Sequence, residues 1–267
     1  RVTRNSELYV DEEDANNILK AVENELRNRR KGDAVRLEVD LDTPEDLVSE
    51  LLEKLELAQE DLYRINGPVN PVHLSGLFEG DHSPELRNDH FIPKPSPTFL
   101  SSETIFETIK AQDVLLHHPY ESFEHVVTLL EEAAEDPKVL AIKQTLYRTG
   151  KDPRIVNALM RAAQNGKQVA VVMELKARFD EASNIRWARE LEEAGIHVSY
   201  GILGYKVHCK VCMIVREEDD GLNRYLHLAT GNYNPATAKL YTDFGLMTCR
   251  PDFGEDVARV FNLLTGF

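Results

Sequence analysis

A histidine and a lysine separated by one residue, His208 and Lys210, are the pair in this chain best suited to phosphate chemistry. The apolar stretch 211–215 that follows indicates a strand, along which side chains alternate between two faces. If the strand extends back to residue 207, His208 and Lys210 share one face. The imidazole could then attack an anionic phosphorus atom while the ammonium neutralises charge on the phosphate oxygens. A solvated histidine beside a surface lysine is the simpler alternative for this pair taken alone.

Polar residues further along the chain favour the chemical interpretation. Asn232 and Asn234 follow an expected strand at 225–229. Their amides could donate to a phosphoryl oxygen, or they could cap the turn before Pro235. Asp243 lies in the last expected strand and could accept the second ring N–H of His208, fixing its tautomer as the acid of a catalytic triad does. A solvated turn aspartate is an equal alternative.

Two arginines follow neighbouring expected strands, at the sheet edge where α/β proteins bind ligands. Arg148 follows strand 139–146, and Arg178 follows strand 168–175. Guanidinium groups are permanently charged forks that match phosphate oxygens. Their matched positions therefore indicate a shared anion site rather than two surface salt bridges. Lys143 and Lys176 could add charge, although each is more typical of a surface lysine with a solvated head group.

The elements that must position these residues indicate an α/β fold. Strands and helices alternate after a proline-rich segment at 80–100, and strands with short connections follow. This order is typical of a mixed or largely parallel sheet with covering helices. The expected strands are 114–116, 139–146, 168–175, 196–200, 206–215, 225–229 and 240–248, and the expected helices are 122–135, 152–165 and 182–194.

Residues 1–94 are expected to form part of a separate, smaller α+β domain, ending in the proline-rich linker. Apolar spacing predicts a helix at 11–30, and alternation predicts a strand at 34–40. Thr43 is the expected N-cap of a further helix, with Pro44 as its first residue. This part holds no obvious catalytic cluster, so we expect the chemistry in residues 95–267.

Composition narrows the partners and the compartment. The 267 residues carry a net charge of −15, which argues against general electrostatic binding of nucleic acid or of an anionic membrane. Cys209, Cys212 and Cys249 cannot form a disulfide framework, which indicates a reducing cytoplasm. Strand alternation puts Cys209 and Cys212 on opposite faces, which disfavours a zinc site. No apolar run reaches membrane-spanning length, and we expect the chain to be a fragment of a longer protein.

Several motifs together resemble the signature blocks of the polyphosphate kinases of type 1. The resemblance is dense over residues 95–267, whereas residues 1–94 resemble the later part of the family's middle domain more loosely. The blocks that carry it are Asp113–Tyr120, Ile142–Arg148, Glu174–Glu181, Asn184–Ala188, His208-x-Lys210, Thr230–Asn234 and Leu240–Asp243.

The resemblance implies a phospholipase D-like mixed sheet with flanking helices for residues 95–267. It implies an enzyme that reversibly transfers the γ-phosphate of ATP to inorganic polyphosphate through a phosphohistidine at His208. Arg148 and Arg178 match positions of the magnesium site. Because guanidinium is a poor metal ligand, we expect them to grip phosphates that carry Mg²⁺. Tyr241 matches a position that contacts the nucleotide, ATP or ADP.

The resemblance also implies a homo-oligomeric full-length enzyme in the cytoplasm, free or at the membrane periphery. Two departures stand out. The phospholipase D pattern has an aspartate five residues after the lysine, where this chain has Val215, so Asp243 is expected to substitute. The fold also uses two His-x-Lys half-sites, and this chain has one, so the fragment alone is expected to be inactive. The alternatives are a phospholipase D-like phosphodiesterase and a non-catalytic module that binds polyanions.

Overall fold

The chain folds into two compact units. The computed structural model describes residues 1–6, 18–29, 32–80, 84–150, 152–202 and 204–266. By their contacts, one unit comprises Arg1–Val10 and Asn24–Phe91, and the other comprises Asp11–Glu23 and Ile92–Phe267. The assignment of residues 1–94 and 95–267 as two domains stays a prediction.

The smaller unit is built on a three-stranded sheet in the order β1-β2-β3, in which β1 and β2 are antiparallel and β2 and β3 are parallel. Its core joins Leu37 and Val39 to Val48 and Leu52, so the alternation predicted at 34–40 is confirmed. The elements are β1 (Val2–Arg4), β2 (Ala34–Asp40), α2 (Glu45–Leu55), β3 (Leu62–Ile65) and α3 (Ser75–Gly80), and α1 (Ile18–Arg29) precedes β2.

The helix predicted at 11–30 is observed as α1 over Ile18–Arg29. Residues 11–17 of the expected first helix lie outside the described residues. The prediction of Thr43 as N-cap is wrong, because Pro44 keeps an extended backbone (ψ 142°) in the N-cap position and the helix begins at Glu45. The acids Glu45 and Asp46 then lie in the first turn, where the helix dipole favours them.

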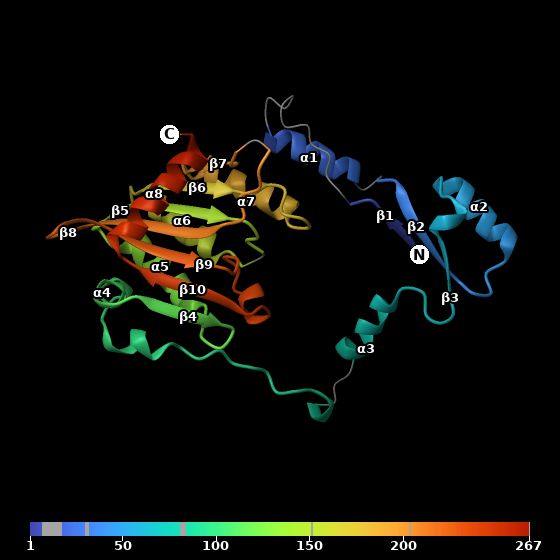
Figure 1. Cartoon of the computed structure of the whole chain (residues 1–267), viewed down its shortest axis with the longest axis horizontal. Helices are drawn as coiled ribbons and strands as arrows, with labels where there is room; N and C mark the ends of the chain where they lie inside the picture. Colours follow the sequence, from blue (N-terminus) through green and yellow to red (C-terminus); the bar gives the residue numbers. More distant parts are fainter. Residues whose placement is uncertain (7–17, 30–31, 81–83, 151, 203, 267) are drawn as a thin grey trace. The chain divides into compact units, whose positions relative to one another are not determined.

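The larger unit is built on a seven-stranded sheet in the order β4-β10-β9-β8-β5-β6-β7 (Figure 1). β5, β6 and β7 are parallel, and every other neighbouring pair is antiparallel. The strands are β4 (Val114–His118), β5 (Val139–Leu146), β6 (Gln168–Met173), β7 (His197–Ser199), β8 (Lys210–Glu218), β9 (Gly221–Ala229) and β10 (Asp243–Thr248).

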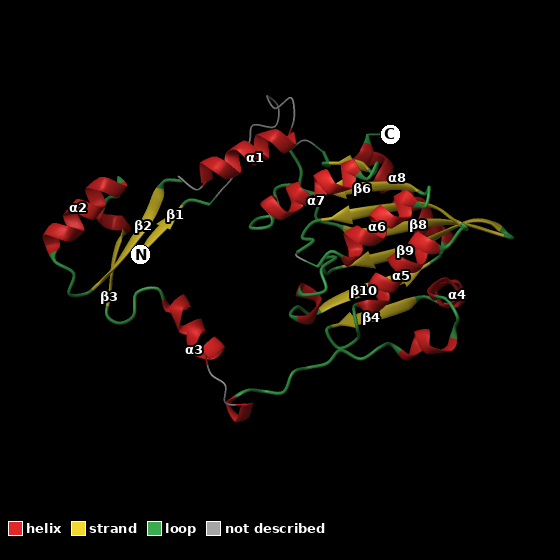
Figure 2. Cartoon of the chain, turned by 180° about the vertical axis from the view of Figure 1, so that it is seen from behind, coloured by secondary structure: helices red, strands yellow, loops and turns green. Residues whose placement is uncertain are grey.

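Helices cover both faces of this sheet. Figure 1 shows α8 in front of the strands, and Figure 2, from behind, shows α5 and α6 in front of them. On the α8 face, Val257 and Phe261 pack against Met213 and Leu226. The helices of this unit are α4 (Ile105–Ala111), α5 (Glu124–Glu135), α6 (Arg154–Gln164), α7 (Glu181–Glu193) and α8 (Pro251–Thr265), with short 3₁₀ helices at Pro97–Ser101 and Thr237–Lys239. The 3₁₀ helices Gln59–Asp61, Pro71–Leu74 and Pro84–Leu86 belong to the smaller unit.

The predicted fold class, a mixed sheet with flanking helices preceded by a smaller α+β part, is confirmed. Three strands begin later than predicted: β7 begins at His197 rather than at residue 196, β8 at Lys210 rather than at residue 206, and β10 at Asp243 rather than at residue 240. His208 therefore lies in the loop that enters β8 and not within the strand. Among the described residues, none of the helices combines the length and the apolar character needed to cross a membrane.

Candidate active site

One edge of the seven-stranded sheet gathers the predicted site residues, because strand direction and register bring their positions together. β5 and β6 are parallel and end at this edge, so Arg148 and Arg178 follow neighbouring strands. β8 runs antiparallel to β5 and begins there, with Lys210 opposite Ala229, the last residue of β9. β10 also begins at this edge, where Gly245 pairs with Ala229 and Asp243 with His118.

The ring of Tyr147 contacts both members of the His208–Lys210 pair. The Tyr147 and His208 ring centroids are 4.7 Å apart at an interplanar angle of 78°, an edge-to-face contact. The Lys210 Nζ lies 4.8 Å from the Tyr147 ring centroid and also donates a hydrogen bond to the His208 carbonyl oxygen. Lys210 is buried, with 4% of its surface exposed, whereas His208 is exposed. The pair is thus adjacent, with the histidine open to a ligand.

The electrostatics of the pair favour a neutral imidazole. Partial desolvation of the ring lowers the pKa of His208, and the charges of Lys210 and Arg148 lower it further. Burial also lowers the pKa of Lys210, and Arg148 adds to this, while Cys209 and Asp243 act in the opposite direction. A neutral imidazole keeps a free lone pair, which is what a nucleophile requires.

The two predicted arginine segments are in direct contact. The Arg148 Nη2 donates to the Arg178 carbonyl oxygen at 3.2 Å, and the Arg148 Nε lies 3.5 Å from an Asp180 carboxylate oxygen. The Arg178 side chain is exposed and lies over the ring of Phe179, whose backbone is left-handed (φ 74°). Arg148 is thus held by the segment that follows β6, with its Cζ 5.8 Å from the Tyr147 ring centroid, and the Arg178 side chain is exposed.

Asp243 is held by the turn that follows β9. The Thr230 Oγ1 donates to the Asp243 Oδ1 at 2.8 Å and accepts from the Phe244 N–H at 2.9 Å. A Cβ on Gly231 would lie 2.7 Å from the Asp243 Oδ2, so only glycine fits there without movement. Within the described residues, Asp243 makes no hydrogen bond to His208, and its predicted role toward the imidazole stays a prediction.

The two asparagines of the turn after β9, Asn232 and Asn234, differ in their hydrogen bonds. Asn234 is buried, and its Oδ1 accepts from the Ala236 N–H at 3.0 Å and the Thr237 N–H at 3.3 Å, as in the turn-capping alternative. A Cβ on Gly150 would lie 2.4 Å from the Asn234 Nδ2, so this turn packs closely on the loop after Arg148. The Asn232 Oδ1 is buried and, among the described residues, has no hydrogen-bond partner.

Tyr241 lies at the rim of this edge, two residues before β10 begins at Asp243. Its side chain is 59% exposed, and the preceding residue, Leu240, is 80% exposed. A large ring this accessible can stack on a planar ligand group. The predicted nucleotide contact of Tyr241 stays a prediction.

Two supporting residues were missed by the sequence reasoning. The buried Glu174 accepts from the Val207 N–H at 2.9 Å and from the Lys176 N–H at 2.8 Å, so it fixes the segment that leads to His208. The buried Asn184 donates to the carbonyl oxygens of Tyr147 at 2.7 Å and Glu174 at 2.8 Å. A glutamate inside an apolar strand run was the available signal for Glu174, because a carboxylate is seldom buried without partners.

Two histidines, one at the end of β4 and one in β9, are buried in the sheet. His118 and His227 are both buried, and the His227 Nδ1 is 2.9 Å from the Tyr233 hydroxyl. Burial, with a smaller contribution from His118, lowers the pKa of His227 to about 3. The ring is therefore neutral at physiological pH and serves as an uncharged support for the turn that holds Tyr233.

The donors of the site suit phosphate rather than a bare metal ion. In the described ranges, no three His, Cys, Asp or Glu side chains are grouped so that they could hold a metal. Mg²⁺ prefers oxygen ligands, and Arg148 and Arg178 offer only N–H donors. The residues present therefore do not fit a magnesium ion held by this chain alone. Cys209 is exposed and Cys212 is buried, both as free thiols.

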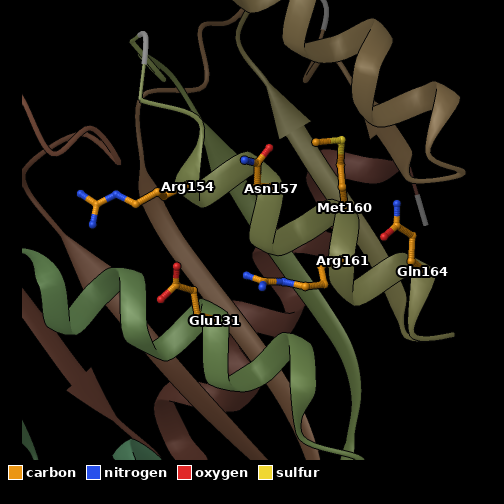
Figure 3. A pocket seen from close by; sticks show the side chains of 6 residues that line it. All are labelled: Glu131, Arg154, Asn157, Met160, Arg161 and Gln164. Carbon is orange, nitrogen blue, oxygen red and sulfur yellow. The ribbon is translucent and has the colours of Figure 1, made fainter.

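A separate hollow of about 370 Å³ lies on helices α5 and α6 (Figure 3). Its two arginines are already neutralised, since Arg154 pairs with Glu124 at 2.6 Å and Arg161 pairs with Glu135 at 3.3 Å. It is therefore a poor candidate for an anion site. The lining residues are Glu131, Arg154, Asn157, Met160, Arg161 and Gln164.

Comparisons with known proteins agree with one another. Residues 104–267 match the family model described as polyphosphate kinase C-terminal domain 1, and residues 1–77 match the polyphosphate kinase middle domain. The chain is 52% identical to polyphosphate kinases of Burkholderia vietnamiensis and Paraburkholderia phytofirmans, over 100% of its own length and 39% of theirs. The crystal structure of polyphosphate kinase from Porphyromonas gingivalis is similar with a TM-score of 0.74 and 33% identity, covering 86% of this chain and 35% of that one.

Proposed function

The chain belongs to the polyphosphate kinase family, and from that premise we propose that its complete protein reversibly transfers the γ-phosphate of ATP to the end of inorganic polyphosphate. His208 is the proposed phosphoryl carrier. The observation that carries the proposal is the exposed His208 imidazole next to the buried Lys210, which donates to the His208 carbonyl oxygen while both side chains contact the Tyr147 ring. Such a site offers a neutral nucleophile in surroundings that attract phosphate.

The proposed chemistry proceeds in two displacements at phosphorus. The ring nitrogen of His208 uses its lone pair to form an N–P bond with the γ-phosphorus, while the bond from that phosphorus to the bridging oxygen breaks and ADP leaves with the electron pair. A terminal oxygen of polyphosphate then attacks the same phosphorus, and the N–P bond breaks to return the imidazole. Phosphoryl transfer of this kind relies on positioning and charge neutralisation more than on acid–base groups.

The remaining predicted residues take supporting roles in this proposal. Lys210, Arg148 and Arg178 neutralise the phosphoryl oxygens, and Asp243 favours the charged form of Lys210. In this proposal Asn232 donates through its Nδ2, not its buried Oδ1, to a phosphate oxygen. The exposed ring of Tyr241 is available for the nucleotide base. Mg²⁺ is proposed only as an ion carried by the nucleotide phosphates.

The chain spans 39% of the length of the relatives it matches, so the activity belongs to the complete protein in this proposal. We also propose that a second His-x-Lys half-site lies outside this chain and that the chain alone is inactive. A cytoplasmic location is proposed as well, which the three free thiols support.

The test is labelling of the complete protein with ATP that carries radioactive phosphorus at the γ-position. Label is expected on the protein as an acid-labile, base-stable adduct and is expected to disappear in His208→Ala. His197→Ala is the matched control, because His197 is also exposed but lies at the start of β7, at the opposite edge of the sheet. An adduct that persists in His208→Ala would overturn the assignment.

A further inference from the structure

Tyr147 makes contacts with three charged or reactive groups of the site through a single ring. Its centroid lies 4.7 Å from that of His208, 4.8 Å from the Lys210 Nζ and 5.8 Å from the Arg148 Cζ. Within the described part of the chain, the Tyr147 hydroxyl makes no hydrogen bond. The contacts therefore depend on the ring and its π electrons rather than on the hydroxyl.

A buried side chain fixes the backbone that carries this ring. Tyr147 directly follows β5, and its carbonyl oxygen accepts from the Asn184 Nδ2 at 2.7 Å. Asn184 is fully buried and is itself held by the Thr149 hydroxyl at 3.2 Å. Because its backbone is anchored, the Tyr147 ring can limit the motion of the side chains that contact it. The exposed imidazole of His208 would otherwise lack this restraint.

We propose that Tyr147 is a positioning residue whose ring holds the His208 imidazole and the Lys210 ammonium side by side in the orientation for phosphoryl transfer. An aromatic face attracts a cation, and an edge-to-face pair restrains rotation of the second ring. The chemical consequence rests on the proposed function, whereas the placement of the two side chains rests on the geometry alone. Neither effect requires Tyr147 to touch the phosphate.

The experiment compares Tyr147→Leu, which removes the π face, with Tyr147→Phe, which keeps it. In the complete protein, Tyr147→Leu is expected to slow labelling of His208 about tenfold, mainly through kcat rather than KM for ATP, and Tyr147→Phe is expected to restore the rate. In the 267-residue chain, NMR titration of the His208 ring proton is the second readout. Its pKa is expected to rise in Tyr147→Leu, because Lys210 and Arg148 are no longer held near the imidazole, and to return in Tyr147→Phe.

An unchanged His208 pKa and labelling rate in Tyr147→Leu would overturn the inference, as would a Tyr147→Phe variant as impaired as the leucine variant. Urea unfolding checks that each variant is folded, and Tyr147→Met replaces the leucine variant if that one unfolds, since methionine fills volume without a π face. Wild-type protein that takes no label from ATP would contradict the proposed function instead, and the NMR titration would still decide the role of Tyr147.

Discussion

The two ends of β8 both present cations on a buried framework, yet they are arranged in opposite ways. At the hairpin end, Arg216 lies 2.7 Å from Asp136 and 2.8 Å from Glu218, and Lys110 contacts Glu218 and lies 3.2 Å from Asp220. At the other end, no carboxylate of the described residues forms an ion pair with the buried Lys210, which instead meets an aromatic ring and a carbonyl oxygen. Arg148, also at this end, has one longer ion pair, with Asp180 at 3.5 Å. The cations at the hairpin end stabilise the fold, whereas Lys210, which lacks a carboxylate partner among the described residues, is available to a ligand anion.

The pKa shifts of Glu218 and Lys210 differ in the same way between the two ends. Burial alone would raise the pKa of Glu218, but hydrogen bonds from Lys110, Tyr225 and Arg216 lower it to about 2. At the other end, burial lowers the pKa of Lys210 and Arg148 adds to this. A buried charge without a full counter-charge costs folding free energy. The burial of Lys210 without a carboxylate partner in the described part of the chain therefore costs folding free energy at the His208 end, and a bound anion would lower that cost.

The largest expected effect is on the labelling rate, in two variants that each replace a lysine at one end of β8 with methionine. Lys210→Met is expected to slow labelling of His208 in the complete protein about 100-fold or more, because charge on the phosphoryl oxygens is no longer neutralised. Stability is expected to hold or increase, since a buried charge is removed. The measurements are the labelling rate and urea unfolding of the chain.

Lys110→Met is the matched control at the hairpin end. It is expected to keep the labelling rate while lowering the urea midpoint, because Glu218 and Asp220 lose their shared partner. Equal losses of labelling in Lys110→Met and Lys210→Met would contradict the contrast between the two ends.

Glu218→Gln should show a smaller effect, on stability alone. The free energy of unfolding at pH 7 is expected to fall by about 2 kcal/mol, since a carboxylate with three charged or hydroxyl donors is lost. The folded pKa of Glu218 lies below its ordinary value of 4.5, so its contribution is present above pH 4.5 and is lost as pH falls toward 2. Urea titrations of both proteins across this range should converge at low pH. A difference that does not depend on pH would show that the charge of Glu218 is not the cause.

The framework of the site could be predicted from the sequence because its signals are local. The apolar runs that form β5 and β6 predict two strands, and residues that follow parallel neighbours must lie at one edge, which brings the Arg148 and Arg178 segments together. For these two strands, residue type and spacing alone carry the information. Strand alternation does not explain the exposed Cys209 and the buried Cys212, because Cys209 lies before β8 begins at Lys210.

The immediate surroundings of His208 could not be predicted in this way. The loop before β8 is not an extension of the strand, because its backbone groups are satisfied by side chains from elsewhere in the sequence. The Thr145 hydroxyl donates to the Cys209 carbonyl oxygen at 2.8 Å, and Glu174 accepts from the Val207 N–H at 2.9 Å. The contacts of Tyr147 likewise join residues about 60 positions apart, which no local pattern reports.

The smallest expected effect concerns the ranking of the cations at the His208 end. Arg148→Gln should raise the pKa of His208, because one of the charges that disfavour the imidazolium is lost, and the rise should be smaller than in Lys210→Met, since Lys210 has the larger influence. The acid limb of the pH profile for labelling should move to higher pH by the same amounts. NMR titration of His208 in the two variants measures the order directly.

Arg216→Gln is the control at the hairpin end, where no change in the pKa of His208 is expected because Arg216 is neutralised by Asp136 and Glu218. A larger rise in Arg148→Gln than in Lys210→Met would mean that Arg148, not Lys210, has the greater influence on the pKa of His208. The difference between the two ends of β8 would then depend on the loop that follows β5.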